Sequence, residues 1–298
     1  MSEPALLAVD WGTTTLRGAL LASDGKVLAE HAAPHGLLSI PPGGWADAFA
    51  AEFGAWLAAH PGLPCLMAGM VGSRQGWVEA PYCACPANLA DLAAQLCWVQ
   101  PGRVAIVPGL SVEVDGLPDV MRGEETQVFG ALALLGLSQA TLVLPGTHSK
   151  WVTVQGGRIT HFATYMTGEV YALLRQQSIL ARTLPADDAA WVAEAFDRGV
   201  DQAQAPGGLL HHLFAVRALS LFDRQDGPWL ASYLSGLLIG DELRAQALPA
   251  GQAVVAVGSA LLTDRYQRAL AQQGHPVRQL GAEAAWTGLL ALSTAARG

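Results

Sequence analysis

The stretch Asp10-Trp11-Gly12-Thr13-Thr14-Thr15-Leu16-Arg17 decides how this chain is interpreted. It follows a short apolar run at residues 6–9, which predicts a buried strand, and it leads into a second apolar run at residues 16–22. Ser-Asp-Gly at residues 23–25 predicts a hairpin turn into a third strand at residues 26–31. The sequence therefore predicts a three-stranded meander whose first connection is a polar turn of glycine and threonine.

The same pattern occurs a second time near residue 140. A strand at residues 141–144 is followed by the polar turn Pro145-Gly146-Thr147-His148-Ser149, by strands at 150–155 and 158–162, and by a Gly-Gly turn between these two. Either polar turn alone is weak evidence, because such short motifs often match by accident. Because both turns take the same place in two similar meanders, we expect duplicated α/β domains at residues 1–137 and 138–298 that face each other across a cleft.

Both turns carry the groups that bind phosphate. Backbone N–H groups and hydroxyls point into a small space, and glycine lets a ligand approach the backbone closely. The candidate phosphate-binding residues are Gly12, Thr13, Thr14, Thr15, Gly146, Thr147, His148, Ser149 and Lys150. For His148 the alternative is a hydrogen bond within the loop, and for Lys150 it is a side chain that points away along the outgoing strand. Asp10, at the end of the first strand, can hold Mg²⁺ directly or through water; the alternative is a turn cap that accepts a local N–H.

A third candidate lies late in the chain. The apolar strand at residues 253–257 is followed by Gly258-Ser259 and by a helix over residues 260–272. A strand, a Gly-Ser turn and a helix start place free N–H groups at the edge of a sheet, which suits a nucleotide. Many α/β units close a strand in this way, so the pattern is weak when taken alone.

Composition excludes several classes of protein. Hydrophobic residues make up 51% of the chain and charged residues 14%, which is enough for buried cores and argues against a largely disordered chain. The net charge of −8 argues against partners such as nucleic acid or an anionic membrane. The apolar runs at 130–137 and 234–239 are too short to span a bilayer, and the start Met-Ser-Glu-Pro is unlike a secretory signal.

The four cysteines predict neither a disulfide scaffold nor a zinc site, because Cys83 and Cys85 lack a matching Cys/His pair. We expect a reduced, cytoplasmic protein, and a homodimer stays open.

Further elements follow from periodicity. The spacing of Trp45, Phe49, Phe53, Trp56 and Leu57 predicts one face of a helix. Further helices are expected at 89–96, 124–135 and 283–295, the last packing near the hinge. Short buried strands are expected at 65–68 and 104–107, and surface loops at 185–188 and 202–208. Thr167 is expected to cap a helix. The pair His211-His212 predicts no metal site. The stripe Leu210, Leu213, Phe214 and Leu221 is expected in the core.

The motifs resemble those of a known superfamily. Residues 10–17 resemble the first phosphate motif of the actin/hexokinase/Hsp70-type ATPases in its sugar-kinase form, Pro145 to Lys150 the second, and Val257-Gly258-Ser259 the adenosine motif. More narrowly, the chain resembles the 2-dehydro-3-deoxygalactonokinase family in the segments AGMVGSRQGW (68–77), MRGEETQ (121–127), LPGTHSKW (144–151), MTGE (166–169) and YLSGLLIGDE (233–242). This resemblance implies two duplicated actin-like ATPase (ribonuclease H-like) domains flanking a nucleotide cleft. It also implies ATP and Mg²⁺ as cofactors and transfer of phosphate to the 6-hydroxyl of 2-dehydro-3-deoxy-D-galactonate, a sugar acid of galactonate catabolism.

The resemblance also implies where the catalytic base lies. In larger sugar kinases a Gly-Asp-Gln segment that opens a helix supplies a carboxylate close to the attacking hydroxyl. Here Gly123-Glu124-Glu125-Thr126-Gln127-Val128-Phe129-Gly130 stands in the corresponding place without an aspartate. The register leaves both glutamates open as catalytic residues, and Glu124 is favoured. The alternative for each is an acidic residue that only complements the helix dipole.

An acceptor with a carboxylate requires a cation or helix-start N–H groups. Arg74, in the glycine-rich stretch 69–76, is the first candidate, followed by Arg17 and Arg122. The alternative is that an arginine on a loop is more often a solvated surface residue or an ion-pair partner. Trp11 and Trp77 are candidates to shape the pocket, with core packing as the alternative.

Two other functions stay open. A kinase of the same fold could act on another acceptor, such as a ketose or an N-acylated hexosamine, because the fold fixes the nucleotide better than the sugar. A nucleotide-dependent sugar sensor could use the same cleft without transfer. Regulators of this kind often carry a DNA-binding helix-turn-helix, for which the residues before Leu6 leave no room.

Overall fold

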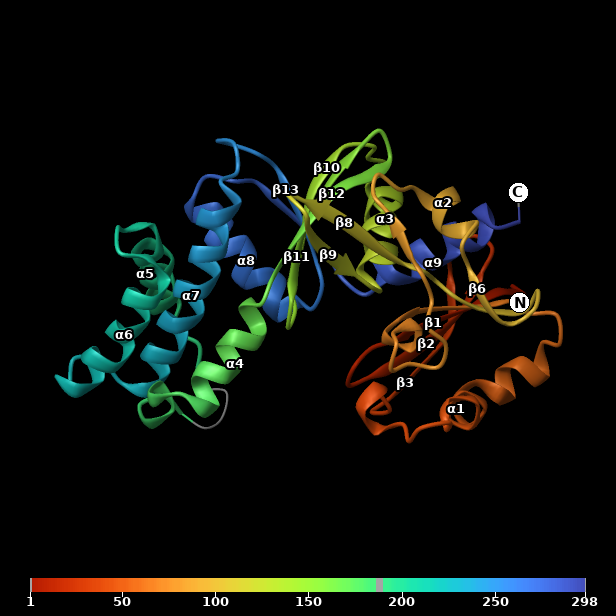
Figure 1. The fold of residues 1–298 in the computed structure, drawn as a ribbon, viewed down its shortest axis with the longest axis horizontal. Coiled ribbons are helices and arrows are strands. Elements are labelled where there is room, and N and C mark those ends of the chain that lie inside the picture. Colours follow the sequence, from red (N-terminus) through yellow and green to blue (C-terminus); the bar gives the residue numbers. More distant parts are fainter. Residues whose placement is uncertain (1, 186–189, 298) are drawn as a thin grey trace. The chain divides into compact units, whose positions relative to one another are not determined.

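The computed structural model describes residues 2–185 and 190–297 (Figure 1). Of the surface loop expected at residues 185–188, residues 186–188 lie outside the described residues. The chain divides into two compact units: Met1–Leu142, Val152–Ala163 and Leu280–Gly298 form unit 1, and Val143–Trp151 and Thr164–Gln279 form unit 2. The domain boundary expected at residue 137 stays a prediction. None of the described helices is long and apolar enough to cross a membrane.

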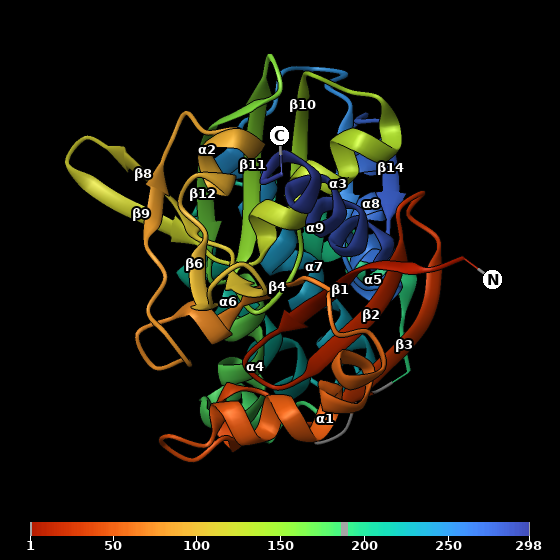
Figure 2. The ribbon, with the colours of Figure 1, turned by 90° about the vertical axis from the view of Figure 1, so that its right-hand side faces the viewer.

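Unit 1 contains a six-stranded sheet in the order β3-β2-β1-β4-β7-β6. Its strands are β1 (Pro4–Trp11), β2 (Leu16–Ala22), β3 (Val27–Ala33), β4 (Cys65–Gly69), β6 (Cys97–Gln100) and β7 (Val104–Ile106). The meander expected at the start of the chain is present, with β1 antiparallel to β2 and β2 antiparallel to β3, and the three strands lie side by side in Figure 2. β4 runs parallel to β1, and β7 runs parallel to β4.

Helices cover this sheet on both faces. On one face Leu7 and Val9 of β1 pack in a core cluster with Phe49 and Phe53 of α1 (Trp45–Ala59), the helix expected from its aromatic spacing. Side chains alternate between faces along a strand, so Asp10 points to the opposite face, where α9 (Glu283–Ala295) contacts β1, β2 and β4. α9 also packs closely on α3 (Glu124–Leu135).

The second sheet repeats the topology of the first. Its order is β12-β11-β10-β13-β14, from β10 (Ala140–Leu144), β11 (Ser149–Gln155), β12 (Arg158–Tyr165), β13 (Val254–Val257) and β14 (Val277–Leu280). In both sheets the first strand of the meander lies inside the sheet, its two successors lie on one side and later strands on the other. The expected duplication of the β-meander is therefore confirmed.

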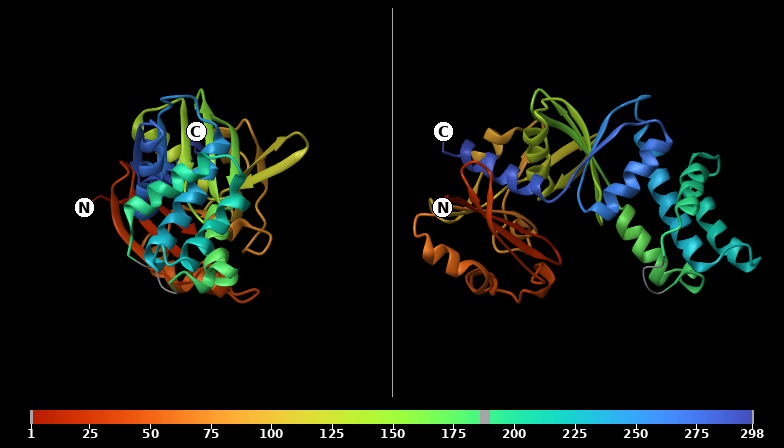
Figure 3. Two further views of the ribbon diagram at one scale, coloured as in Figure 1. Left: turned by 90° about the vertical axis from the view of Figure 1, so that its left-hand side faces the viewer. Right: turned by 180° about the vertical axis from the view of Figure 1, so that it is seen from behind.

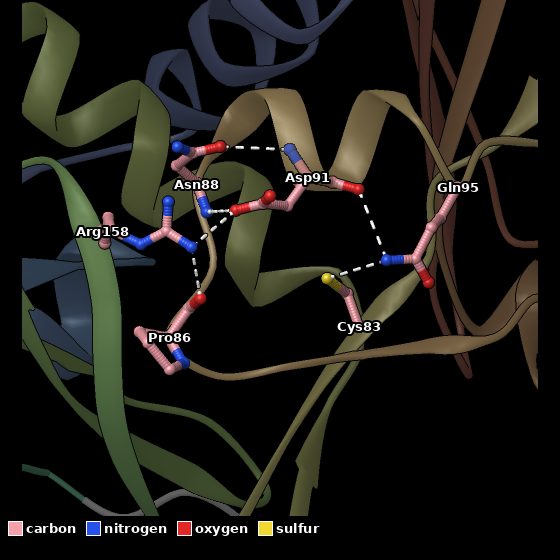
Figure 4. Close-up of polar contacts among 6 residues, drawn as sticks. All are labelled: Cys83, Pro86, Asn88, Asp91, Gln95 and Arg158. Carbon is pink, nitrogen blue, oxygen red and sulfur yellow. Dashed lines mark hydrogen bonds and ion pairs between the residues drawn. The ribbon is translucent and has the colours of Figure 1, made fainter.

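A smaller sheet, β5 (Tyr82–Ala84), β8 (Gly109–Val114) and β9 (Leu117–Met121), completes unit 1. Its strand β5 is followed by α2 (Leu89–Ala93), whose start is closed by a capping box between Asn88 and Asp91 (Figure 4). Arg158 of β12 donates to Asp91 at 2.9 Å and to the Pro86 carbonyl at 2.6 Å, and Gln95 donates to the Cys83 sulfur at 3.1 Å. The two bonds of Arg158 tie the α2 segment to β12 within unit 1.

Helices dominate the rest of unit 2. They are α4 (Thr167–Gln177), α5 (Ala193–Gln204), α6 (Gly208–Leu221), α7 (Gly227–Gln246) and α8 (Ala260–Gln272), with a short 3₁₀ turn at Ile179–Arg182. Two further 3₁₀ turns, Leu37–Ser39 and Met70–Gly72, belong to unit 1. α5 and α6 both pack on α7, and Figure 3 shows the three helices side by side. α7 is the most buried of them, with core residues on every side of its middle turns.

The structure corrects four expectations. The loop expected at 202–208 is shorter, because α5 continues to Gln204 and α6 begins at Gly208. The helix expected at 89–96 ends at Ala93. Thr167 is the first residue of α4 and not its cap, because its hydroxyl bonds to Glu242. Three of the four residues of the α6 stripe are not core: Leu210 is 86% exposed, Phe214 60% and Leu221 59%, because α6 buries a different face through His212 and Val216. The fourth, Leu213, is half-buried and packs against a core cluster, as expected.

Candidate active site

Within unit 1, three segments singled out from the sequence meet at one place. β1 and β4 are parallel, and their register sets Asp10 beside Ala68 and Trp11 beside Gly69. Gly69 has a φ of +96°, which L side chains rarely adopt, and it turns the chain sharply at the end of β4. A Cβ built on Gly123 would lie 3.1 Å from the Gly69 Cα. The end of β1, the glycine-rich stretch and the start of α3 therefore lie together.

Glu124 and Glu125 occupy the first turn of α3 and differ in exposure. Glu124 is half-buried, and its Oε2 accepts a hydrogen bond from the Arg122 amide at 3.0 Å. Glu125 is fully buried, and its Oε2 accepts from the Gly123 amide at 2.7 Å. Burial, helped by the negative charge of Glu124, raises the pKa of Glu125 to about 8. Only Glu124 therefore has surface available to a substrate.

Asp10 is paired with Arg17 across the β1–β2 ladder. Arg17 Nη2 donates to Asp10 Oδ2, and the guanidinium lies over the indole of Trp286, 5.8 Å from the ring centroid. The other carboxylate oxygen, Oδ1, faces Gly69, 3.4 Å from where a Cβ would stand. The Asp10 carboxylate is partly exposed, and carboxylate oxygens are ligands that Mg²⁺ prefers, so the residue fits the expected metal.

The first polar turn is a closed loop with exposed hydroxyls. The Gly12 amide donates to the Thr15 carbonyl at 2.9 Å, and the amides of Leu37 and Leu38 donate to the Gly12 and Thr13 carbonyls. All three threonines, Thr13, Thr14 and Thr15, are exposed. The turn is therefore held from behind by its own backbone and by the 3₁₀ turn after β3, and its hydroxyls are accessible.

The second polar turn, in unit 2, packs on the start of α4. The Glu169 amide donates to the Thr147 carbonyl at 2.9 Å, and a Cβ on Gly168 would lie 2.3 Å from the Gly146 carbonyl oxygen. His148 and Glu169 form a hydrogen bond of 2.5 Å between their side chains. Thr147 and His148 are exposed, whereas Ser149 and Lys150 are buried. Lys150 Nζ donates to the Thr164 hydroxyl at 2.7 Å.

The Gly-Ser turn after β13 lies against this loop. Gly258 directly follows β13, and a Cβ built on it would lie 3.5 Å from the Pro145 carbonyl oxygen. Ser259 is the N-cap residue of α8. A small pocket of about 50 Å³ opens beside it. Residues from the second turn, α4, α7 and α8 line it: Gly146, Thr167, Gly168, Tyr171, Ser235, Leu238, Ile239, Leu262, Arg265 and Tyr266.

The remaining sequence candidates divide by burial. Arg74 has an 87% exposed side chain and pairs with Glu79 at 3.3 Å. Arg122 is buried, donates to the Ala80 carbonyl at 2.8 Å and lies over the Tyr82 ring at 4.3 Å. Trp11 is fully buried in the core under α1 and donates to the His35 carbonyl, and Trp77 is half-buried against Phe49. Arg74 is the cation of this set that is accessible to a ligand.

One residue of the pocket region had no role in the sequence analysis. Glu242 of α7 is buried, and its carboxylate accepts hydrogen bonds from the side chains of Ser149, Trp151, Thr167 and Tyr266. The available signal was a carboxylate inside a helix segment that is otherwise almost wholly apolar or small, from Leu230 to Leu243. Its four partners are spread over more than a hundred residues of sequence, so only the fold shows them together.

Similarity to known proteins extends over almost the whole chain. The model of the 2-keto-3-deoxy-galactonokinase family matches residues 10–292. The chain belongs to this family. The 2-dehydro-3-deoxygalactonokinase of Escherichia coli (strain K12) is 36% identical over 282 residues, covering 94% of each chain.

Solved structures extend the comparison to the fold. A protein from Sinorhizobium meliloti, provisionally named a 2-dehydro-3-deoxygalactonokinase, superposes with a TM-score of 0.88 at 37% identity over 98% of each chain. The (R)-2-hydroxyglutaryl-CoA dehydratase component A of Acidaminococcus fermentans gives a TM-score of 0.54 at 13% identity over 98% of each chain. The expected membership of the galactonokinase family and the expected actin-like ATPase fold class are confirmed, and the family is one of sugar-acid kinases.

Proposed function

We propose that this chain transfers the γ-phosphoryl group of ATP to the 6-hydroxyl of 2-keto-3-deoxy-D-galactonate, giving the 6-phosphate and ADP in galactonate catabolism in the cytoplasm. The observation that carries the proposal is the family match over residues 10–292. The E. coli relative, which is named for this activity, also matches the chain over almost its whole length. The meeting of Asp10, the Gly69 turn and Glu124 within unit 1 supports it, because phosphoryl transfer needs positioning and charge neutralisation more than covalent chemistry.

The nucleotide side of the proposal uses the polar turns. The exposed hydroxyls of Thr13, Thr14 and Thr15 and the backbone of Gly12 would bind phosphate oxygens, as would Gly146, Thr147 and His148. The pocket beside Gly258 and Ser259 would take the base, because apolar side chains such as Leu238 and Ile239 form much of its lining. Asp10 would hold Mg²⁺, which would neutralise charge on the phosphates when bound.

For the acceptor, we assign the base to Glu124. Its half-buried carboxylate can accept the proton of the attacking hydroxyl, while the buried Glu125 holds the first turn of α3 through its bond to the Gly123 amide. Arg74 is proposed to bind the carboxylate of the sugar acid. Its pairing with Glu79 is solvent-exposed and therefore weak enough to be exchanged for a ligand. Arg122 would support the turn that presents Arg74 by its bond to the Ala80 carbonyl.

The test is acceptor-dependent release of ADP by purified protein with Mg-ATP. The acceptors would be 2-keto-3-deoxy-D-galactonate, its gluconate epimer, a ketose and an N-acetylhexosamine, with the Glu124→Gln variant as the control for catalysis. We expect turnover with the galactonate derivative and loss of it in the variant. If only one of the other acceptors were turned over, that acceptor would take the place of the galactonate derivative as the proposed substrate. ATP binding without turnover on any acceptor would favour a sensor.

A further inference from the structure

We propose that Glu242 is a positioning residue for nucleotide binding: its carboxylate fixes the second polar turn, the start of α4 and the Tyr266 wall of the pocket in one arrangement. The inference rests on the proposed use of this pocket and turn for ATP. It concerns a residue that does not itself line the pocket but bonds to two residues that do, Thr167 and Tyr266.

The hydrogen bonds of Glu242 use both carboxylate oxygens. Oε1 accepts from the Trp151 indole at 2.7 Å. Oε2 accepts from the hydroxyls of Ser149 and Tyr266, each at 2.8 Å, and from the hydroxyl of Thr167. An ionised carboxylate has about two lone-pair positions on each oxygen, so the three donors at Oε2 use that oxygen fully, whereas Oε1 serves Trp151 alone among these four donors. Burial raises the pKa of Glu242, and these four bonds oppose that rise.

The four donors come from three parts of the nucleotide side, because Ser149 and Trp151 both lie on β11. Ser149 is the last residue of the polar turn and the first of β11. Thr167 begins α4, and the next residue, Gly168, contacts the Gly146 carbonyl. Tyr266 lies on α8, and both Thr167 and Tyr266 line the pocket. One side chain therefore connects the turn, one pocket wall from α4 and another from α8.

This network also decides which hydroxyls face a ligand. The Ser149 and Thr167 hydroxyls donate to Glu242, so their protons are not directed at a phosphate. Thr147 and His148, which are exposed, and the backbone amides of the turn form its accessible face. Ser149, expected from the sequence to touch the nucleotide, is proposed instead to hold the turn from behind.

Loss of the carboxylate would leave the donors without their acceptor. A glutamine has nearly the same shape, but its NH₂ cannot accept a hydrogen bond, so one side of the network must reorient in either flip. Because buried donors without partners are costly, the turn and the two walls would shift to find other acceptors. A nucleotide that needs all three in register would then bind more weakly.

The experiment compares Glu242→Gln with wild-type protein and with Leu237→Ala. Leu237 is a fully buried residue of the same helix that lies outside both the network and the pocket, so its variant reports plain loss of helix packing. Calorimetric titration with Mg-ATP, without acceptor, gives the Kd. Amide hydrogen exchange of residues 145–151 and 167–171 gives local order in the free protein.

We expect Glu242→Gln to raise the Kd for ATP at least tenfold and to speed exchange in both segments, with the KM for the acceptor within about twofold of wild type. Leu237→Ala should lower the melting temperature and keep the wild-type Kd. A Glu242→Gln variant that loses thermal stability and binds ATP as wild type does would overturn the inference. If that variant does not fold, Tyr266→Phe, which removes one bond, should weaken ATP binding several-fold, and an unchanged Kd would equally overturn it.

The proposed function can fail separately. Wild-type protein that binds ATP but phosphorylates no sugar acid would refute the acceptor and leave the comparison of Kd values valid. Wild-type protein that binds no nucleotide would refute the proposed function itself, whatever the variants do. Exchange rates in the free protein would then still show whether Glu242 orders the two segments.

Discussion

Gly130 of α3 and Gly288 of α9 pass so closely that neither position has room for a side chain. A Cβ on Gly130 would lie 1.8 Å from the Ala284 carbonyl oxygen, and a Cβ on Gly288 would lie 1.8 Å from the Thr126 carbonyl oxygen. Because α3 begins with Glu124, this helix crossing fixes where the proposed base stands relative to the sheet.

Replacing Gly288 by alanine should therefore force the two helices apart. We expect Gly288→Ala to lower the free energy of unfolding by at least about 2 kcal/mol, in the range of overpacked cores. The matched control is Gly54→Ala in α1, where a Cβ meets only the Ala50 Cβ at 3.9 Å; this change should leave stability equal or raise it by up to about 1 kcal/mol. Urea unfolding of both variants checks this, and equal stabilities would contradict the packing argument.

Substitution by glutamine should affect the two glutamates at the start of α3 differently. Glu124→Gln should lower kcat at least about a hundredfold, the usual contribution of a general base, and keep the Kd for ATP within about threefold. Glu125→Gln should lower kcat less than about tenfold, because glutamine imitates the protonated carboxyl that its raised pKa implies. Steady-state kinetics with calorimetric ATP titration measure both. A larger loss of kcat in Glu125→Gln than in Glu124→Gln would mean that Glu125 is the catalytic base.

The buried Glu125 should also make stability depend on pH. Its pKa is about 8 in the folded protein and near its ordinary value of 4.5 in the unfolded chain. Between these values the folded state keeps a proton that the unfolded state has lost, so the free energy of unfolding falls as pH rises. The slope from one such group is at most about 1.4 kcal/mol per pH unit.

The measurement is urea unfolding of wild type and Glu125→Gln across this pH window. Glu242, whose pKa is also raised, is present in both proteins, so the difference between the two profiles isolates Glu125. We expect wild type to lose stability relative to the variant as pH increases. Parallel profiles would show that Glu125 does not hold its proton.

The exposed apolar side chains of α6 should contribute little to folding. Phe214→Ala is expected to change the free energy of unfolding by less than about 0.5 kcal/mol, as is usual for surface positions. Phe196→Ala in α5, where the ring is fully buried, should cost about 3–5 kcal/mol. Thermal unfolding at low protein concentration compares the two. A loss at Phe214 equal to that at Phe196 would mean that another surface covers this ring in solution.

Local patterns were sufficient for most elements. The apolar runs around Asp10 and Pro145 predicted both meanders, and helices 124–135 and 260–272 have the expected ends, because glycine and polar residues interrupt the apolar periodicity there. The prediction that the α6 stripe lies in the core was wrong for Leu210, Phe214 and Leu221, and the reason is physical. Helical spacing shows which residues share a face, but apolar residues lie on more than one face of α6, and only its contact with α7 selects the buried one.

The site divides in the same way. The sequence by itself determined the duplicated meander, its two Gly-Thr turns and the glutamate pair after Gly123, because each depends on residues that are neighbours in the chain. Tertiary structure alone decided that Glu125 is buried while Glu124 is accessible, and that Ser149, Trp151, Thr167 and Tyr266 share the carboxylate of Glu242. Burial and hydrogen-bond partners depend on segments far apart in sequence, and no local pattern records which of them will meet.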